Sequence, residues 1–268
     1  MHWYVTDETN SSFVAGHFFI YGGLVMTDEQ VLQVTDAVTT IREKYGYVRG
    51  DSFKFHTRSR PTQVSVDDSK AAKRELVEAL ENIGVRMIVY VILHDIASAK
   101  TDEVRMNWAL NTVTWAFHRL LEKEDARGVF LMDRADEQHA HLANLFQLGI
   151  DVAGKRVPVD DRIIMLGMTS DNASHLSSAV DIALGGFRYS VNAASGDGSE
   201  AVAADIFPPL ARIIWSQNFR GTDYLRNYGF HSMPKTEIKS GRFKAMYTDL
   251  YAKLDGFTGS NSEAQVES

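Results

Sequence analysis

The sequence predicts an α/β fold in which a mixed β-sheet is flanked by helices. Two extended apolar runs come first, at residues 2–6 and 13–26, and helical segments then alternate with further strands. Residues 85–93, Val-Arg-Met-Ile-Val-Tyr-Val-Ile-Leu, are almost continuously apolar, which is typical of a strand buried on both faces. Extended runs ahead of an alternating pattern indicate a sheet with both antiparallel and parallel pairs.

The first half of the chain gives clear boundaries for its elements. A polar turn at 8–12 separates the first two strands, and Gly22 and Gly23 inside the second predict a close approach of backbone. Thr27 is a typical cap for a helix over 28–44. A short extended segment at 52–56 precedes a helix over 65–83, which begins at an N-cap serine and stops at a glycine.

The second half alternates regularly between helix and strand. We expect helices over 102–123, 136–148 and 174–192, and strands over 129–132 and 163–168. A Gly/Ser-rich break at 194–199 follows. The predicted organisation is therefore a core over 1–192, a C-terminal helical extension over 193–258 and a disordered tail over 259–268.

Composition excludes several classes of protein. The chain has no cysteine, so it has neither a disulfide framework nor a thiolate metal site. A net charge of −7 argues against coating nucleic acid by bulk electrostatics, although it leaves room for an enzyme that acts on nucleic acid. No signal pattern or membrane-length apolar run is present, so we expect a cytoplasmic protein without a membrane partner.

Three aspartates in mostly apolar settings are the strongest functional signal. Asp7 ends the first strand beside Glu8, and Asp133 ends the strand at 129–132. Asp181 lies inside an apolar helical run, where an ionised carboxylate must be paired or coordinated. Each also has a structural alternative: an Asx-turn for Asp7, pairing with Arg134 for Asp133, or pairing with Arg188 for Asp181.

Carboxylates at strand ends and on a facing helix form the type of oxygen-ligand site that Mg²⁺ and Mn²⁺ prefer. Two such ions activate a water and stabilise the leaving oxygen in phosphodiester cleavage. The sequence therefore favours a site in which Asp7, Asp133 and Asp181 ligate Mg²⁺ or Mn²⁺.

Four short segments, taken together, resemble a bacterial and phage family called domain of unknown function 3800. Residues 4–9 (Tyr-Val-Thr-Asp-Glu-Thr) are similar to its Asp-Glu-Ser-Gly start, and residues 53–56 (Phe-Lys-Phe-His) to its Glu-x-Lys-Phe block. Residues 132–134 resemble its central strand-end aspartate, and residues 178–181 its closing Gln-x-x-Asp helix. The resemblance implies a ribonuclease H-like fold whose acids meet at metal ions.

The match departs from the family pattern at one position that matters for metal binding. Ser52 stands where the family commonly has glutamate, and Asp51 comes one position earlier. Either Asp51 replaces that ligand or the chain has lost it. Asp51 is not an automatic substitute, because a shift of one residue on a strand reverses the face of the side chain.

The segment around the Glu-x-Lys-Phe block is also basic. Lys54 and His56 lie two residues apart, so an extended segment presents both to one side, where they would contact a phosphate. The alternative is an exposed, amphiphilic edge segment.

The function that these residues predict is a divalent-metal-dependent nuclease or phosphodiesterase of ribonuclease H-like type, in phage defence or a mobile element. Its catalytic set would be Asp7, Glu8, Asp51, Lys54, His56, Asp133 and Asp181, with nucleic acid as the substrate. The alternative is a catalytically weak or inactive module of the same fold that binds nucleic acid or a protein partner.

Overall fold

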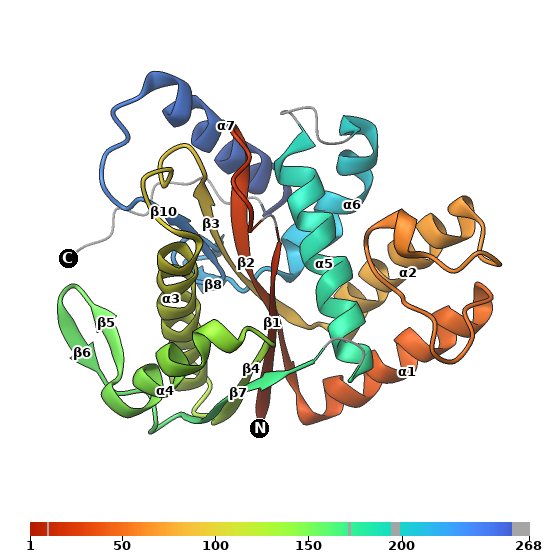
Figure 1. Cartoon of the computed structure of the whole chain (residues 1–268), viewed down its shortest axis with the longest axis horizontal. Helices are drawn as coiled ribbons and strands as arrows, with labels where there is room; N and C mark the ends of the chain where they lie inside the picture. Colours follow the sequence, from red (N-terminus) through yellow and green to blue (C-terminus); the bar gives the residue numbers. More distant parts are fainter. Residues whose placement is uncertain (10, 171–172, 194–198, 259–268) are drawn as a thin grey trace.

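A six-stranded mixed sheet with helices on both faces forms the centre of the computed structural model (Figure 1). The structure describes residues 1–9, 11–170, 173–193 and 199–258. In spatial order, the strands are β10 (Phe230–Met233), β3 (Arg86–Leu93), β2 (Phe18–Thr27), β1 (His2–Thr9), β4 (Gly128–Asp133) and β7 (Ile163–Thr169). This arrangement confirms the predicted α/β fold with a mixed sheet.

The directions of the strands divide the sheet in two. β3, β2 and β1 form an antiparallel meander, whereas β1, β4 and β7 run parallel. In the order β3-β2-β1-β4-β7, strand β1 thus joins the antiparallel part of the sheet to the parallel part. β10 is added parallel to β3 at the outer edge.

Two glycines allow the meander to pack closely, as the sequence predicted. A β-carbon on Gly22 would lie 2.2 Å from the carbonyl oxygen of Ile88, and one on Gly23 would lie 1.8 Å from that of Val5. Neither contact is possible for a real side chain, so only glycine permits this approach to both neighbouring strands.

Most of the helices cover one face. This face carries α1 (Asp28–Lys44), α2 (Val66–Ile83), α5 (His175–Val191), α6 (Glu200–Ile213) and α7 (Gly241–Thr258), while α3 (Asp102–Lys123) and α4 (His139–Leu148) cover the other (Figure 1). Each face has its own apolar core. The capping box expected at Thr27 is present, because its hydroxyl accepts from Gln30 N and the Gln30 side chain accepts from Thr27 N.

Short elements complete the described chain. They are the 3₁₀ turns η1 (Thr57–Ser59) and η2 (Asp136–Gln138), and the hairpins β5 (Ile150–Val152) with β6 (Lys155–Val157) and β8 (Gln217–Phe219) with β9 (Thr222–Tyr224). The helix expected over 136–148 thus begins as a 3₁₀ turn. The segment expected to be extended at 52–56 is a loop outside the sheet.

The C-terminal extension contains the expected helices, α6 and α7, but it also contains strands. β10 lengthens the main sheet, and Trp215 N donates to the carbonyl of Met87 at 2.9 Å. The four-residue β10, with polar His231 and Ser232 at its centre, is too short and too polar to show a strand pattern. The turn residue Asn10, most of the Gly/Ser-rich break and the tail at 259–268 lie outside the described residues. No helix in the described ranges is long and apolar enough to cross a membrane.

Candidate metal and phosphate site

Two of the predicted aspartates lie where the parallel pairing of β1 with β4 ends. Thr6 of β1 pairs with Met132 of β4, so the next residues, Asp7 and Asp133, emerge side by side. Val5 packs into the core beneath α5, and side chains alternate along a strand, so Asp7 faces the same side as Val5. Met132 packs into the opposite core, and Asp133 therefore also faces α5.

The third aspartate is supplied by α5, which packs against β1 and β2 and runs beside them in Figure 1. Asp181 Oδ2 accepts a hydrogen bond from Phe55 N at 2.6 Å. Its flanking residues, Val180 and Ile182, are buried, whereas Asp181 itself is only partly buried. The apolar residues of this run thus pack the helix into the core, and Asp181 lies at the edge of its buried face.

Electrostatics shows that the three carboxylates interact. Burial first, and then the neighbouring charges of Glu8, Asp181 and Asp133, raise the pKa of Asp7 to about 7, while the Glu8 N–H, 2.8 Å from Asp7 Oδ1, opposes them. Negative charges gathered around a buried carboxyl create a region where a cation is favoured. The donor set, all carboxylate oxygen, suits a hard cation such as Mg²⁺ or Mn²⁺.

Among the described residues, no three His, Asp or Glu side chains form a ready-made metal group. The assignment of Asp7, Asp133 and Asp181 as metal ligands therefore stays a prediction. The alternative for Asp133 was pairing with Arg134. Arg134 instead donates hydrogen bonds to Asp136, at 2.8 and 2.9 Å, which argues against that pairing.

Glu8 belongs to the other face of β1. Side chains alternate, so Glu8 follows Tyr4, whose ring lies in the core beneath α3, and Thr6, whose hydroxyl is 2.8 Å from that of Tyr21. Alternation along the strand thus sends the two adjacent acids to opposite faces. Glu8 acts on Asp7 through its charge.

Asp51 is engaged in its own loop. Its Oδ2 accepts from Val48 N and from Gln63 Nε2, both at 2.7 Å, and Arg42 donates to its carbonyl oxygen at 2.9 Å. These contacts fix the turn that leads into the loop. Asp51 therefore has a structural use, and nothing in its contacts supports it as a substitute for the glutamate of the family pattern.

His56 and Lys54 lie in the same loop. The exposed His56 caps η1, because its Nδ1 accepts from Arg58 N at 3.2 Å, and Lys54 is partly buried. Since the segment is not a strand, the spacing of two residues does not place both side chains on one face. The link from this segment to the carboxylates is Phe55.

Phe55 is wedged against α5. A β-carbon on Gly185 would lie 2.4 Å from both Cβ and Cγ of Phe55, so glycine at 185 makes room for the ring. The ring of Tyr189 lies 6.0 Å from that of Phe55, on the same helix. This packing brings the Phe55 N–H to Asp181 and fixes the carboxylate.

Sequence reasoning missed one charged residue beside the site. Lys73 of α2 is 7% exposed, and its Nζ lies 3.4 Å from Thr57 Oγ1 and 5.9 Å from the centre of the Phe55 ring. Burial, together with the charges of Arg60 and Lys70, lowers its pKa to about 8, and the charge of Asp181 opposes this. Lys73 shares a helical stripe with Ala72, Leu76, Val77 and Leu80, and a lysine in such a stripe was the available signal.

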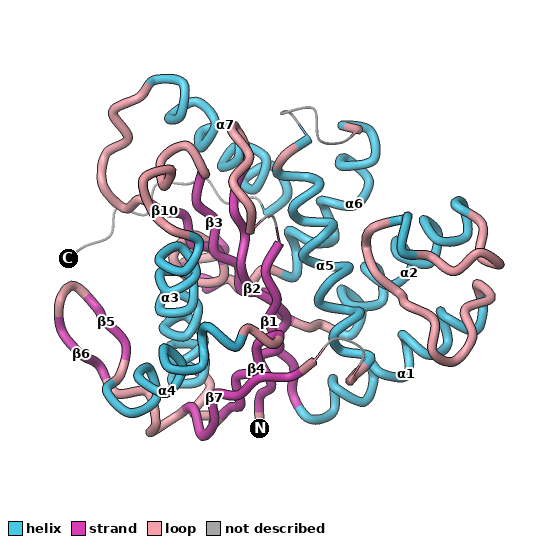
Figure 2. The backbone as a smooth tube through the Cα atoms, viewed as in Figure 1, coloured by secondary structure: helices cyan, strands magenta, loops and turns pink. Residues whose placement is uncertain are grey.

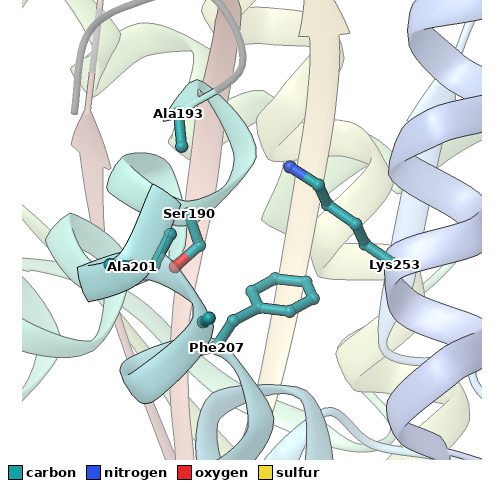
Figure 3. A pocket seen from close by; sticks show the side chains of 7 residues that line it. Ser190, Ala193, Ala201, Phe207 and Lys253 are labelled. Carbon is teal, nitrogen blue, oxygen red and sulfur yellow. The ribbon is translucent and has the colours of Figure 1, made fainter. Parts of the chain in front are cut away.

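A cavity of about 440 Å³ lies elsewhere, between the C-terminal part of α5, α6 and α7 (Figure 3). Lys253 extends from α7 toward it, opposite Ser190 and Ala193 (Figure 3). Ser190 is nine residues beyond Asp181 along α5, roughly 13 Å. Its hydroxyl donates to the Gly186 carbonyl at 2.9 Å, and the rest of the lining is mainly alanine, so this cavity lacks the chemistry of the carboxylate site.

Comparisons with protein-family models, with curated proteins and with solved structures found no match for this chain.

Proposed function

We propose that the protein is a divalent-metal-dependent phosphodiesterase that acts on nucleic acid. One observation supports this most strongly. Asp7 and Asp133 lie where the parallel pairing of β1 with β4 ends, on the face covered by α5, and the charges of Asp133 and Asp181 both raise the pKa of Asp7. Three separate elements bring these carboxylates together at a cost in electrostatic repulsion. A bound cation would offset that repulsion.

Each residue has a distinct role in this proposal. Asp7, Asp133 and Asp181 hold Mg²⁺ or Mn²⁺, which when bound polarises a phosphate and acidifies a water molecule. Phe55 orients Asp181 through its N–H. Glu8 adds negative charge that strengthens cation binding, and Lys54, in the loop that carries Phe55, would contact a phosphate.

The test is cleavage of labelled single-stranded, double-stranded and hybrid substrates with Mn²⁺ or Mg²⁺. We expect Asp7→Asn and Asp133→Asn each to lower the rate by more than about 100-fold, beyond the 10- to 100-fold typical of residues that only support a ligand. Asp136→Asn is the matched control, because Asp136 follows the same strand but pairs with Arg134 on the surface. Equal losses in all three variants, or a metal-independent rate, would contradict the proposal.

A second candidate is a module of the same fold that binds nucleic acid or a protein partner without cleaving it. The observation that favours it is Asp51, whose carboxylate is engaged in a turn while Ser52 stands at the usual glutamate position. A protein that binds Mn²⁺ and nucleic acid but leaves all three substrates intact would establish this alternative.

A further inference from the structure

Beside the carboxylates lies a group of positive charges that the metal site does not use. Lys73 of α2 and Arg60 of the preceding loop both bind Thr57: Lys73 Nζ lies 3.4 Å from its hydroxyl, and Arg60 Nη1 donates to its carbonyl oxygen at 3.2 Å. Lys70 lies one turn before Lys73 on α2 and is exposed. The loop that carries Thr57 runs beside α5 (Figure 2).

These partners hold the cations in place without neutralising them. Thr57 is uncharged, and Arg60 Nε donates to another carbonyl, that of Val64, at 3.1 Å. The carboxylate that acts on Lys73 is that of Asp181, which also faces the other acids. Arg60 and Lys70 add like charge beside Lys73, and an additional negative charge would be favourable there.

The excess of negative charge at the three aspartates and the excess of positive charge around Lys73 are complementary. Asp7 and Asp133 lie on the face of the sheet that α5 covers, whereas Lys73 binds Thr57 in the loop whose Phe55 N–H donates to Asp181. One side favours a cation and the other an anion. Exposure also changes in order, from exposed Lys70 through partly buried Arg60 to buried Lys73, so the positive charge leads from the surface inward.

We propose that Lys73 and Arg60, joined through Thr57, form a binding subsite for a phosphate group next to the three aspartates. A phosphate suits it because Arg60 presents a planar guanidinium and Lys73 a compact ammonium, the two side chains proteins use for this anion. In the proposed function, on which this role rests, the subsite binds the substrate strand beside the bond that is cleaved. Binding itself requires neither metal nor catalysis.

The test uses the full-length protein in buffer with EDTA, so that no metal contributes. The probes are inorganic phosphate, followed by its effect on the melting temperature, and a fluorescein-labelled single-stranded oligothymidylate, followed by anisotropy over a range of KCl concentrations. The variants are Lys73→Met, which keeps the buried stem, and Lys73→Arg, which keeps the charge. Lys123→Met, exposed on α3 at the opposite face, is the control.

We expect phosphate to raise the melting temperature of the wild type, Lys73→Arg and Lys123→Met by a few degrees and that of Lys73→Met much less. Lys73→Met should also reduce the slope of log K against log salt for the oligonucleotide by about 0.7, the loss of one phosphate contact on a single strand. Stabilisation by phosphate without oligonucleotide binding would assign the subsite to a small phosphorylated ligand.

The subsite is excluded if phosphate leaves the wild type unchanged, or if Lys73→Met responds as the wild type does to both probes. An equal loss in Lys123→Met would also exclude it, because binding would then follow overall charge. A protein that binds phosphate through Lys73 but never cleaves nucleic acid would overturn the proposed function and leave the subsite intact. Cleavage of nucleic acid by the protein, together with a Lys73→Met variant that responds to both probes as the wild type does, would support the proposed function and exclude the subsite.

Discussion

Asp7 is the residue at which burial and like charge act together. In the absence of a cation its pKa is raised to about 7, mainly by burial and then by Glu8, Asp181 and Asp133. Between the ordinary aspartate pKa and this value, the folded state binds a proton that the unfolded state has released. Its contribution to the free energy of unfolding therefore falls as the pH rises from about 4 to about 7, and then stays constant.

We expect Asp7→Asn to remove this pH dependence. At pH 8 without metal the variant should be more stable than the wild type by roughly 1–3 kcal/mol, less than the full pKa shift implies, because the side chain is partly exposed and solvent screens its charge. Asn Oδ1 also retains the hydrogen bond from Glu8 N.

Urea unfolding in EDTA at pH 4, 6 and 8 measures the effect. Asp36→Asn, which changes an exposed carboxylate on α1, is the control and should leave the profile of the wild type unchanged. Parallel pH profiles for the wild type and Asp7→Asn would mean that burial and neighbouring charges do not raise the pKa of Asp7.

At the scale of elements, the packing of one loop on one helix positions the site. The loop between α1 and α2 has little regular structure, yet Phe53 is 1% exposed and Phe55 is wedged against Gly185. The N–H of Phe55 then meets Asp181. Loop and helix are 126 residues apart in sequence, so this contact depends on the completed fold.

Two neighbouring glycines of α5 provide a matched test. Gly185→Ala forces Cβ and Cγ of Phe55 to move, whereas the β-carbon of Gly186→Ala meets the end of the flexible Leu210 side chain at 3.0 Å. Both changes favour helix by up to about 1 kcal/mol. We expect Gly185→Ala alone to weaken Mn²⁺ binding, by about 10- to 100-fold, as for other residues that orient a ligand.

Isothermal titration with Mn²⁺ measures the affinities, and the double variant Gly185→Ala/Phe55→Gly should recover part of the loss, because it removes both overlapping atoms of Phe55 and keeps the N–H at position 55. The same affinity for the two single variants would show that Phe55 does not orient Asp181.

Elements with strong local patterns could be predicted from the sequence. The buried strand at 85–93, the capped helix after Thr27 and the glycine-dependent approach of β2 all appear where expected. Asp7, Asp133 and Asp181 were identified because each interrupts an apolar run. Lys73 was overlooked since it lies within a helix with many charges, and the positions of Asp51 and His56 depend on loop contacts that have no periodic signal.

The whole molecule depends on its C-terminal part more than the predicted organisation suggested. β10 pairs with β3, and the buried hydroxyl of Tyr247 in α7 donates to the carbonyl oxygen of Met233 and accepts from Leu93 N at 2.9 Å. Leu250 and Leu254 pack into the same core as α5. Residues 193–258 thus complete the sheet and cover one of its faces.

A fragment of residues 1–192 should therefore fail to fold cooperatively. It would expose the edge of β3 together with the apolar surface that α6 and α7 cover, and exposed edges of this kind aggregate. We expect a broad or absent thermal transition and large species in size-exclusion chromatography, whereas residues 1–258 should melt as the full chain does. A sharp transition of the monomeric fragment would contradict this account.

The central claim is that Asp7, Asp133 and Asp181 bind one divalent-cation centre, and Mn²⁺ titration monitored by melting temperature tests it most directly. At a concentration 100 times the dissociation constant, binding to the folded state contributes about 2.7 kcal/mol, a rise of roughly 5–10 °C for a chain of this size. We expect Asp181→Asn to stay folded and lose this rise, while Asp36→Asn keeps it. An Asp181→Asn variant that gains as much from Mn²⁺ as the wild type would contradict the claim.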